Sequence, residues 1–129
     1  MSRELKFRAY SLKYKCYVDI WQITFDDENL PSVIEFEYEG LLRKELANTF
    51  VIEQYTDLKD KNGKEIYEGD IVMYGRKVFR VEFDEMKDSD CFYYYLGWAI
   101  GDLSLCEHNT MVEVIGNIHE NPELLGGGE

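Results

Sequence analysis

Apolar and polar residues alternate with a period of two along much of this chain, a pattern typical of half-buried β-strands. The clearest case is a six-residue stretch of apolar and acidic positions: Ile34, Glu35, Phe36, Glu37, Tyr38 and Glu39. Similar strand patterns cover residues 5–10, 16–25, 49–55, 78–83, 92–100 and 111–118. Residues 41–48 differ, because Leu42, Glu45 and Leu46 have helical spacing and predict a short helical turn.

Turn signals divide these patterns and predict the domain organisation. Asp60-Lys61-Asn62-Gly63 favours a tight turn, and Gly69-Asp70 precedes an apolar strand. Asn121-Pro122 and Gly126 bracket a single helical turn near the C-terminus. We therefore expect an all-β or β-rich α+β fold. The expected regions are an N-terminal strand layer (1–56), a turn or linker (57–63), a small barrel-like bent sheet (64–125) and a frayed tail (126–129).

The charge balance changes the picture of possible partners. The 129 residues include 26 acidic and 14 basic side chains, for a formal net charge of −12. Such a surface repels phosphate backbones and anionic lipids, so direct nucleic-acid or membrane binding is not expected. A protein partner, particularly a basic one, is favoured instead. Binding of nucleic acid through Lys6, Arg8 and other basic residues is the contrary hypothesis.

The cysteines and apolar runs bear on the compartment. Cys16, Cys91 and Cys106 are an odd and widely spaced set, which does not predict a disulfide framework. No apolar run approaches the length needed to span a membrane. We expect a cytoplasmic protein with reduced thiols.

Three segments carry a resemblance to a known family. Residues 54–72 read Gln-Tyr-Thr-Asp-Leu-Lys-Asp-Lys-Asn-Gly-Lys-Glu-Ile-Tyr-Glu-Gly-Asp-Ile-Val, which resembles the signature of the YopX-like family of bacteriophage and prophage proteins. Residues 6–10 and 114–125 resemble the opening strand of that family and its closing strand and turn. The sequence departs from the pattern at Asp57, where glycine is usual, and aspartate is one of the few residues that tolerate a positive φ there.

The resemblance implies a mainly β fold and an origin in phages or prophages of Gram-positive bacteria. It also implies a homo-oligomer, with a trimer as one form. No biochemical activity is established for the family, so the resemblance carries over no catalytic residues.

Candidate chemistry in the sequence is sparse. An EF-hand reading of residues 60–70 fails because the glycine and the final glutamate do not fall at their required positions. Cys106 and His108, with Cys91 and His119 elsewhere, lack the second closely spaced pair that zinc sites show, although a thiol or carboxylate enzyme remains an alternative. We expect no catalytic site, no metal and no cofactor.

Two groups of residues are candidates for contact with a partner. Glu35, Glu37 and Glu39 would repeat along one strand face, either as a solvated face or as a row of charge that imitates a nucleic-acid backbone. Alternation at 92–100 places Tyr93 and Tyr95 opposite the more apolar face, where they either contact a partner or pack under a second layer. The leading hypothesis is a non-enzymatic phage accessory protein that acts through protein contacts. A nucleic-acid-mimicking inhibitor of a host protein is the second hypothesis.

Overall fold

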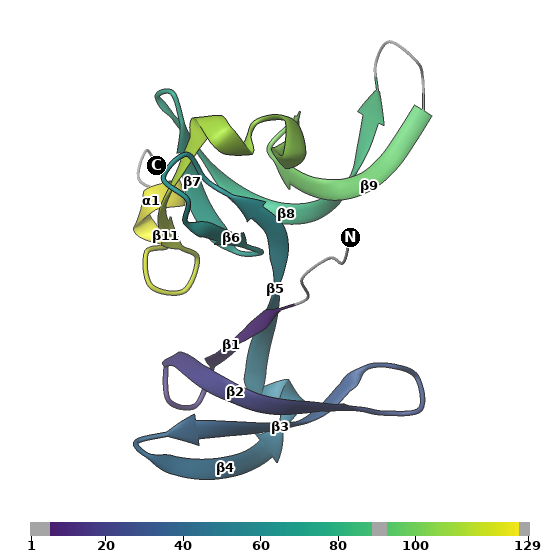
Figure 1. The fold of residues 1–129 in the computed structure, drawn as a ribbon, viewed down its shortest axis with the longest axis vertical. Coiled ribbons are helices and arrows are strands. Elements are labelled where there is room, and N and C mark those ends of the chain that lie inside the picture. Colours follow the sequence, from purple (N-terminus) through teal and green to yellow (C-terminus); the bar gives the residue numbers. More distant parts are fainter. Residues whose placement is uncertain (1–5, 89–92, 127–129) are drawn as a thin grey trace. The chain divides into compact units, whose positions relative to one another are not determined.

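The computed structural model describes residues 6–88 and 93–126, with side chains described outside residues 84–96. Antiparallel strands dominate, so the expected β-rich class is confirmed (Figure 1). The expected C-terminal helical turn is present as the only α-helix of the described chain. The elements are β1 (Phe7–Ser11), β2 (Cys16–Phe25), β3 (Pro31–Tyr38), β4 (Leu41–Leu46), η1 (Ala47–Thr49), β5 (Phe50–Lys59), β6 (Glu65–Tyr67), β7 (Asp70–Tyr74), β8 (Lys77–Asp88), β9 (Tyr93–Ile100), β10 (Leu103–Ser104), η2 (Leu105–Glu107), η3 (Asn109–Met111), β11 (Val112–Asn117) and α1 (Glu123–Gly126).

The chain divides into two compact units, and each has its own hydrophobic core. Of the described residues, the N-terminal unit comprises residues 6–54 and the C-terminal unit those from residue 55 onward. The long strand β5 runs from the first unit into the second. The boundary between the two units therefore lies within β5, and no turn residues mark it in the sequence.

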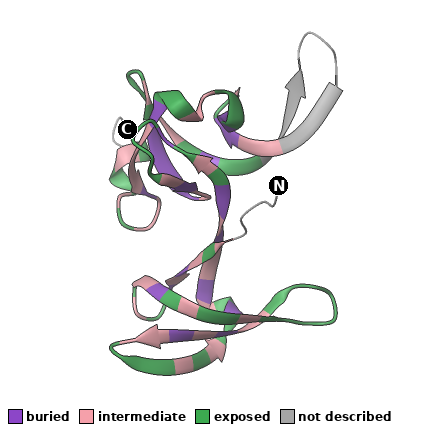
Figure 2. Cartoon of the chain, viewed as in Figure 1, coloured by how far each residue is buried: buried purple, intermediate pink, exposed green. Residues whose placement is uncertain are grey.

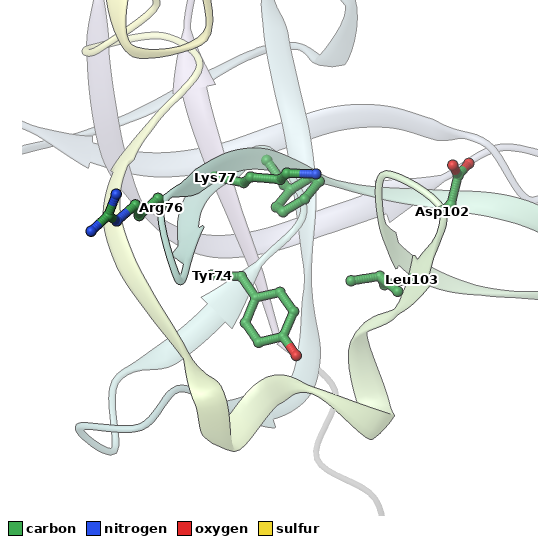
Figure 3. A pocket seen from close by; sticks show the side chains of 6 residues that line it. Tyr74, Arg76, Lys77, Asp102 and Leu103 are labelled. Atoms are coloured by element: carbon green, nitrogen blue, oxygen red, sulfur yellow. The ribbon is translucent and has the colours of Figure 1, made fainter.

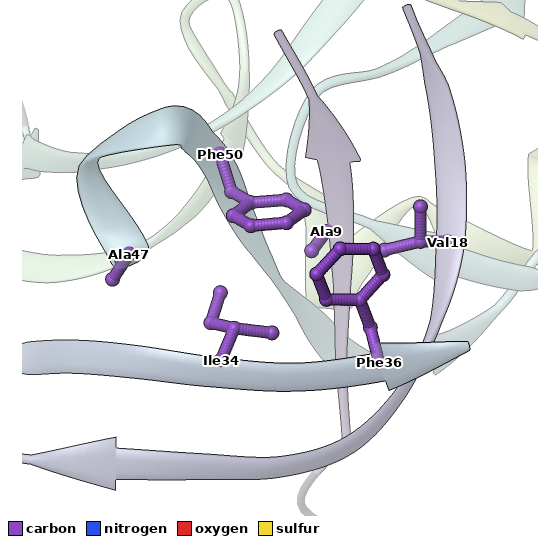
Figure 4. Packing of buried hydrophobic residues seen from close by; sticks show 6 residues of the cluster. All are labelled: Ala9, Val18, Ile34, Phe36, Ala47 and Phe50. Carbon is purple, nitrogen blue, oxygen red and sulfur yellow. The ribbon is translucent and has the colours of Figure 1, made fainter. Parts of the chain in front are cut away.

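The N-terminal unit is a curled antiparallel sheet with the strand order β4-β3-β2-β1-β5. The residues of β3 that alternate with its acids point into the core, as their apolar character predicts (Figure 4). The ring of Phe36 meets that of Phe50 edge-on, with centroids 5.1 Å apart. The buried core contains six residues: Ala9, Val18, Ile34, Phe36, Ala47 and Phe50.

The helical turn expected at residues 41–48 is wrong, because Leu41–Leu46 form β4. Glu39 and Gly40 form the tight turn before it, with φ angles of 54° and 77°. This turn folds β4 back along β3 and pairs Tyr38 with Leu41. Pairing with a neighbouring strand outweighs the weak helical spacing, and the helical geometry is limited to the 3₁₀ turn η1.

The C-terminal unit is built on a sheet with the strand order β10-β9-β8-β7-β11, and the second half of β5 forms a hairpin with β6. β10 and β11 are the outer strands of this order, so the described strands form an open, bent sheet. The core consists of fully buried aliphatic residues: Ile66, Val72, Val81, Ile100, Leu105 and Val112.

A bulge in β5 explains an unusual residue. The pairing between β5 and β6 shifts between Tyr55 and Leu58, and Asp57 lies within that shift with a φ of 68°. A left-handed residue at a bulge is normally glycine, which the YopX-like pattern has at this position. The strand continues to Lys59, so the tight turn expected in this region begins only at Asp60.

Candidate functional site

The acidic residues of β3 lie on the face of the N-terminal sheet that is opposite its core. Glu35 and Glu37 are half-buried there, and they alternate with the buried residues Ile34 and Phe36, which point the other way. Glu39 lies beyond the end of the strand, in the turn. The strand row is therefore shorter than expected, because the chain turns back after Tyr38.

Neighbouring strands change the charge of this face. Asp19 of β2 is directly opposite Glu37, and Lys44 of β4 is directly opposite Glu35. Like charges directly opposite each other destabilise a sheet, so the Asp19–Glu37 pair is a feature that packing alone does not favour. We name Asp19, Glu35 and Glu37 the acidic face.

Tyr93 and Tyr95, the other candidate contact residues, belong to β9, and their side chains lie outside the described residues. Cys91 lies outside them as well. Their expected roles therefore stay predictions.

The loop between β2 and β3 and much of β4 have the colour of exposed residues in Figure 2. Several large apolar side chains of the N-terminal unit are exposed. Leu12, in the turn between β1 and β2, is 51% exposed, and six further residues are 50–66% exposed: Trp21, Phe25, Leu30, Leu41, Leu42 and Leu46. They come from β2, β4 and the loop between β2 and β3. We name these six residues the apolar surface; they belong to one unit, although Leu41 and Leu42 point to opposite faces of the sheet, and large exposed apolar side chains are candidates for contact with a partner.

The basic residue predicted for a nucleic-acid site is already bound within the protein. Arg8 donates from Nε to Glu53 Oε1 over 2.7 Å, and its guanidinium carbon lies 4.7 Å from the centroid of the Tyr17 ring. Tyr17 donates its hydroxyl to the same oxygen over 2.9 Å, and Glu53 is buried. The three residues form a polar cluster in which Arg8 neutralises a buried carboxylate of this chain.

The Asp60 turn is a structural clamp. Asp60 Oδ1 accepts from the backbone N–H groups of Asn62 and Lys64, and Oδ2 accepts from that of Val114, all at 2.9 Å. Burial raises the pKa of Asp60, but these hydrogen bonds outweigh it and hold the pKa below its usual value of 3.8. The expected hairpin turn is confirmed, and both oxygens that a calcium ion would need are already engaged.

The Gly69-Asp70 pair has the same character. Gly69 has a φ of 86°, and Asp70 Oδ2 accepts from the backbone N–H of Tyr67 over 2.7 Å. The expected tight turn with a carboxylate that binds backbone is confirmed.

Cys106 and His108 do not act on each other. Cys106 is exposed and its sulfur lies 3.2 Å from the hydroxyl of Ser104, while His108 Nδ1 lies 2.8 Å from the Ser104 carbonyl. The imidazole ring also meets the ring of Tyr74 edge-on at 5.4 Å. This geometry offers the thiol no base.

The described residues contain neither a metal-binding group nor a membrane-spanning helix. No group of three or more His, Cys, Asp or Glu side chains in residues 6–88 and 93–126 is arranged to hold a metal ion. No helix in the same part of the chain has the length and apolar character needed to cross a membrane.

A cleft in the C-terminal unit was not anticipated from the sequence. It has a volume of about 500 Å³ and is lined by Tyr74, Arg76, Lys77, Phe79, Asp102 and Leu103 (Figure 3). Arg76 and Lys77 are exposed, and neither has an ion pair among the described side chains. Aromatic walls beside unpaired cations can hold a ring that carries an anionic group. The two adjacent cations in so acidic a chain are the signal that would have indicated this cleft.

The comparisons with known proteins agree with this fold. The model of the family described as YopX protein matches residues 6–126. A solved structure, that of protein EF1440 from Enterococcus faecalis, is 33% identical and superposes with a TM-score of 0.60, covering 96% of this chain and 99% of the other. No curated protein matches the chain. Since the family match extends over nearly all of the sequence, the chain belongs to the YopX family.

Proposed function

We propose that this YopX-family chain is a phage or prophage accessory protein that acts by binding another protein and catalyses no reaction. The observation that carries the proposal is the apolar surface of the N-terminal unit, where six large side chains are at least half exposed. Such side chains contribute little to folding, but they gain hydrophobic free energy when a partner covers them. Three carboxylates of the described residues have structural roles, because Asp60 and Asp70 accept from backbone N–H groups and Glu53 pairs with Arg8.

Charge indicates the chemistry of the partner. The acidic face lies in the same unit as the apolar surface, and the whole chain carries a net charge of −12. Complementary potentials favour a partner with basic residues around an apolar patch. Association with such a partner becomes weaker as salt is added, because screening reduces the charge attraction.

The test compares two variants of the full chain in pull-downs from host lysate. Trp21→Ser/Phe25→Ser removes two members of the apolar surface, and Phe83→Ser/Met111→Ser removes two similarly exposed residues of the C-terminal unit. We expect the first variant to lose a partner that the second retains, in a salt-dependent manner. A partner that both variants retain equally, or the absence of any partner of the wild type, would contradict the proposal.

A second candidate function is imitation of nucleic acid, which the Asp19–Glu37 pair favours. Directly opposed carboxylates reduce sheet stability, and such a cost is typical of a surface that is kept for binding. The acidic face would then occupy the basic groove of a host protein that handles nucleic acid.

Charge reversal separates this candidate from general protein binding. In the variant Asp19→Lys/Glu35→Lys/Glu37→Lys, which reverses the whole acidic face, we expect capture of nucleic-acid-binding proteins to stop. The control Asp27→Lys/Glu28→Lys/Glu107→Lys makes the same change of charge at exposed sites away from β3. If both reversals release the captured proteins equally, net charge alone explains the capture and the candidate fails.

A further inference from the structure

We propose that two copies of this chain pair through the exposed edges of their β4 strands, which join the two N-terminal sheets into one continuous antiparallel sheet. The proposal rests on the proposed function and assigns only the β4 residues of the apolar surface to a second copy of the chain, so Trp21 and Phe25 stay open to the basic partner. β4 ends the strand order β4-β3-β2-β1-β5, so one side of it has no neighbouring strand among the described residues.

The hairpin geometry shows which backbone groups face outward. A two-residue loop joins β3 to β4, so its closing pair, Tyr38 and Leu41, is a hydrogen-bonded pair. Hydrogen-bonded pairs alternate along an antiparallel ladder. The residues of β4 whose N–H and C=O groups point away from β3 are therefore Leu42, Lys44 and Leu46.

These outward groups lack partners almost completely. Within the described chain, the one additional bond is from the hydroxyl of Thr49 to the Leu46 carbonyl, over 2.8 Å. That carbonyl keeps a second lone pair, so it can still accept from another strand. The side chains of Leu42 and Leu46 are 63% and 60% exposed. An open edge with apolar side chains is a template for another strand.

A single register satisfies both copies. The two-fold axis passes between the two Lys44 residues, so that Leu42 of each copy lies opposite Leu46 of the other. The outward-facing residues then form the hydrogen-bonded pairs, which two-fold symmetry and the alternation of the sheet require. The same register places Arg43 of each copy opposite Glu45 of the other.

Arg43 and Glu45 each have a polar atom that is free to bond across this contact. Arg43 Nε is buried and has no hydrogen-bond partner, while its guanidinium lies against the rings of Tyr14 and Tyr38. Glu45 uses only Oε2, which accepts from Tyr14 and lies 3.6 Å from Lys13 Nζ. A buried donor without a partner is costly, and a carboxylate from a second copy would relieve that cost.

The two Lys44 side chains lie opposite each other at the centre of the dimer, and each has a carboxylate of its own copy beside it. Each faces Glu35 of its own β3 strand, so the row across both copies reads Glu35, Lys44, Lys44 and Glu35. Two other symmetric registers also pair the outward-facing residues, with the two-fold axis at residue 43 or at residue 45. The first places the two Arg43 side chains opposite each other and the second does so with the two Glu45 side chains, so like charges repel in both. Charge complementarity thus favours the proposed register over its alternatives.

The experiment measures the solution mass of the full chain over a wide range of concentration, by sedimentation equilibrium. We expect a reversible dimer. Arg43→Glu places two glutamates opposite each other at both ends of the pair, and Glu45→Arg does the same with arginines. Each variant alone should weaken association by about tenfold. Circular dichroism of each variant shows whether it remains folded.

Rescue tests the register itself. The double variant Arg43→Glu/Glu45→Arg restores opposite charges, so we expect its dimerisation to return toward that of the wild type. An equimolar mixture of the two single variants should form a heterodimer. A wild type that stays monomeric, a trimer, or a double variant no better than the singles overturns the proposal. A monomeric chain that still loses its lysate partner on Trp21→Ser/Phe25→Ser leaves the proposed function standing, so the two failures are distinguishable.

Discussion

The two units differ in whether the outer edge of their last strand is covered. In the C-terminal unit the outer side of β11 is covered by the Asp60 turn, since Lys61 donates to the Val112 carbonyl and Asp60 accepts from the Val114 N–H group. In the N-terminal unit the outer side of β4 has no such cover among the described residues. Proteins usually protect exposed edges, so an edge left open beside leucines indicates a surface that is kept for contact.

The cores show the same contrast. The C-terminal core is made of aliphatic residues with 0% exposure, whereas the N-terminal core includes two alanines and leaves larger apolar residues outside. Buried apolar area supplies most of the stability of a small unit. We therefore expect the N-terminal unit to be the less stable of the two.

The largest expected effect comes from a cavity in the smaller core. Phe36→Ala removes the central ring of the N-terminal unit and should lower the free energy of unfolding by about 4 kcal/mol. Because each unit has its own core, hydrogen exchange should rise in residues 7–52 more than in residues 71–81. Ile100→Ala is the matched change in the other core and should reverse that pattern. Equal loss of protection in both units for both variants would contradict the comparison.

Removal of the Asp60 clamp should expose the protected edge. Asp60→Ala leaves three backbone N–H groups without their acceptor and should cost about 3 kcal/mol in urea unfolding. Asp60→Asn keeps one acceptor oxygen and should lose less. If Asp60→Ala is as stable as the wild type, the turn does not hold β11 in the way that we describe.

The same clamp predicts a dependence on pH. The pKa of Asp60 is lower in the folded protein than its usual value of 3.8, so its contribution is fully present above that value. The contribution is lost as the pH falls through the folded pKa. The difference in unfolding free energy between the wild type and Asp60→Ala should therefore shrink in acid, and a difference that stays constant from neutral to strongly acidic pH would count against it.

The smallest expected effect lies in the bulge of β5. Asp57 has a φ of 68°, which glycine adopts without steric cost, so Asp57→Gly should stabilise the chain by about 0.5 kcal/mol. Asp57→Val adds a branched side chain at that angle and should destabilise it by about 1–2 kcal/mol. Thermal unfolding of both variants measures the order, and a valine variant as stable as the glycine variant would show that the angle is not enforced.

Sequence patterns of neighbouring residues predicted strands and turns correctly, whereas contacts between distant residues were not predictable. The alternation at 34–38 and the Asp60–Gly63 turn depend on neighbours in the chain, so their strand and hairpin were predictable. The helical turn at 41–48 was a wrong prediction, because the tight turn at Gly40 pairs that segment with β3. Arg8 and Glu53 are 45 positions apart, so their ion pair could not be inferred before the strands were paired.

The sequence by itself determined the β-rich class, the YopX family and the turns, because alternation, motif and turn chemistry are written in adjacent residues. Tertiary structure alone decided that Asp19 faces Glu37 and that Lys44 faces Glu35. It also decided that one outer strand is covered while the other is open. These facts depend on strand order and register, which arise from contacts between distant segments that no local pattern specifies.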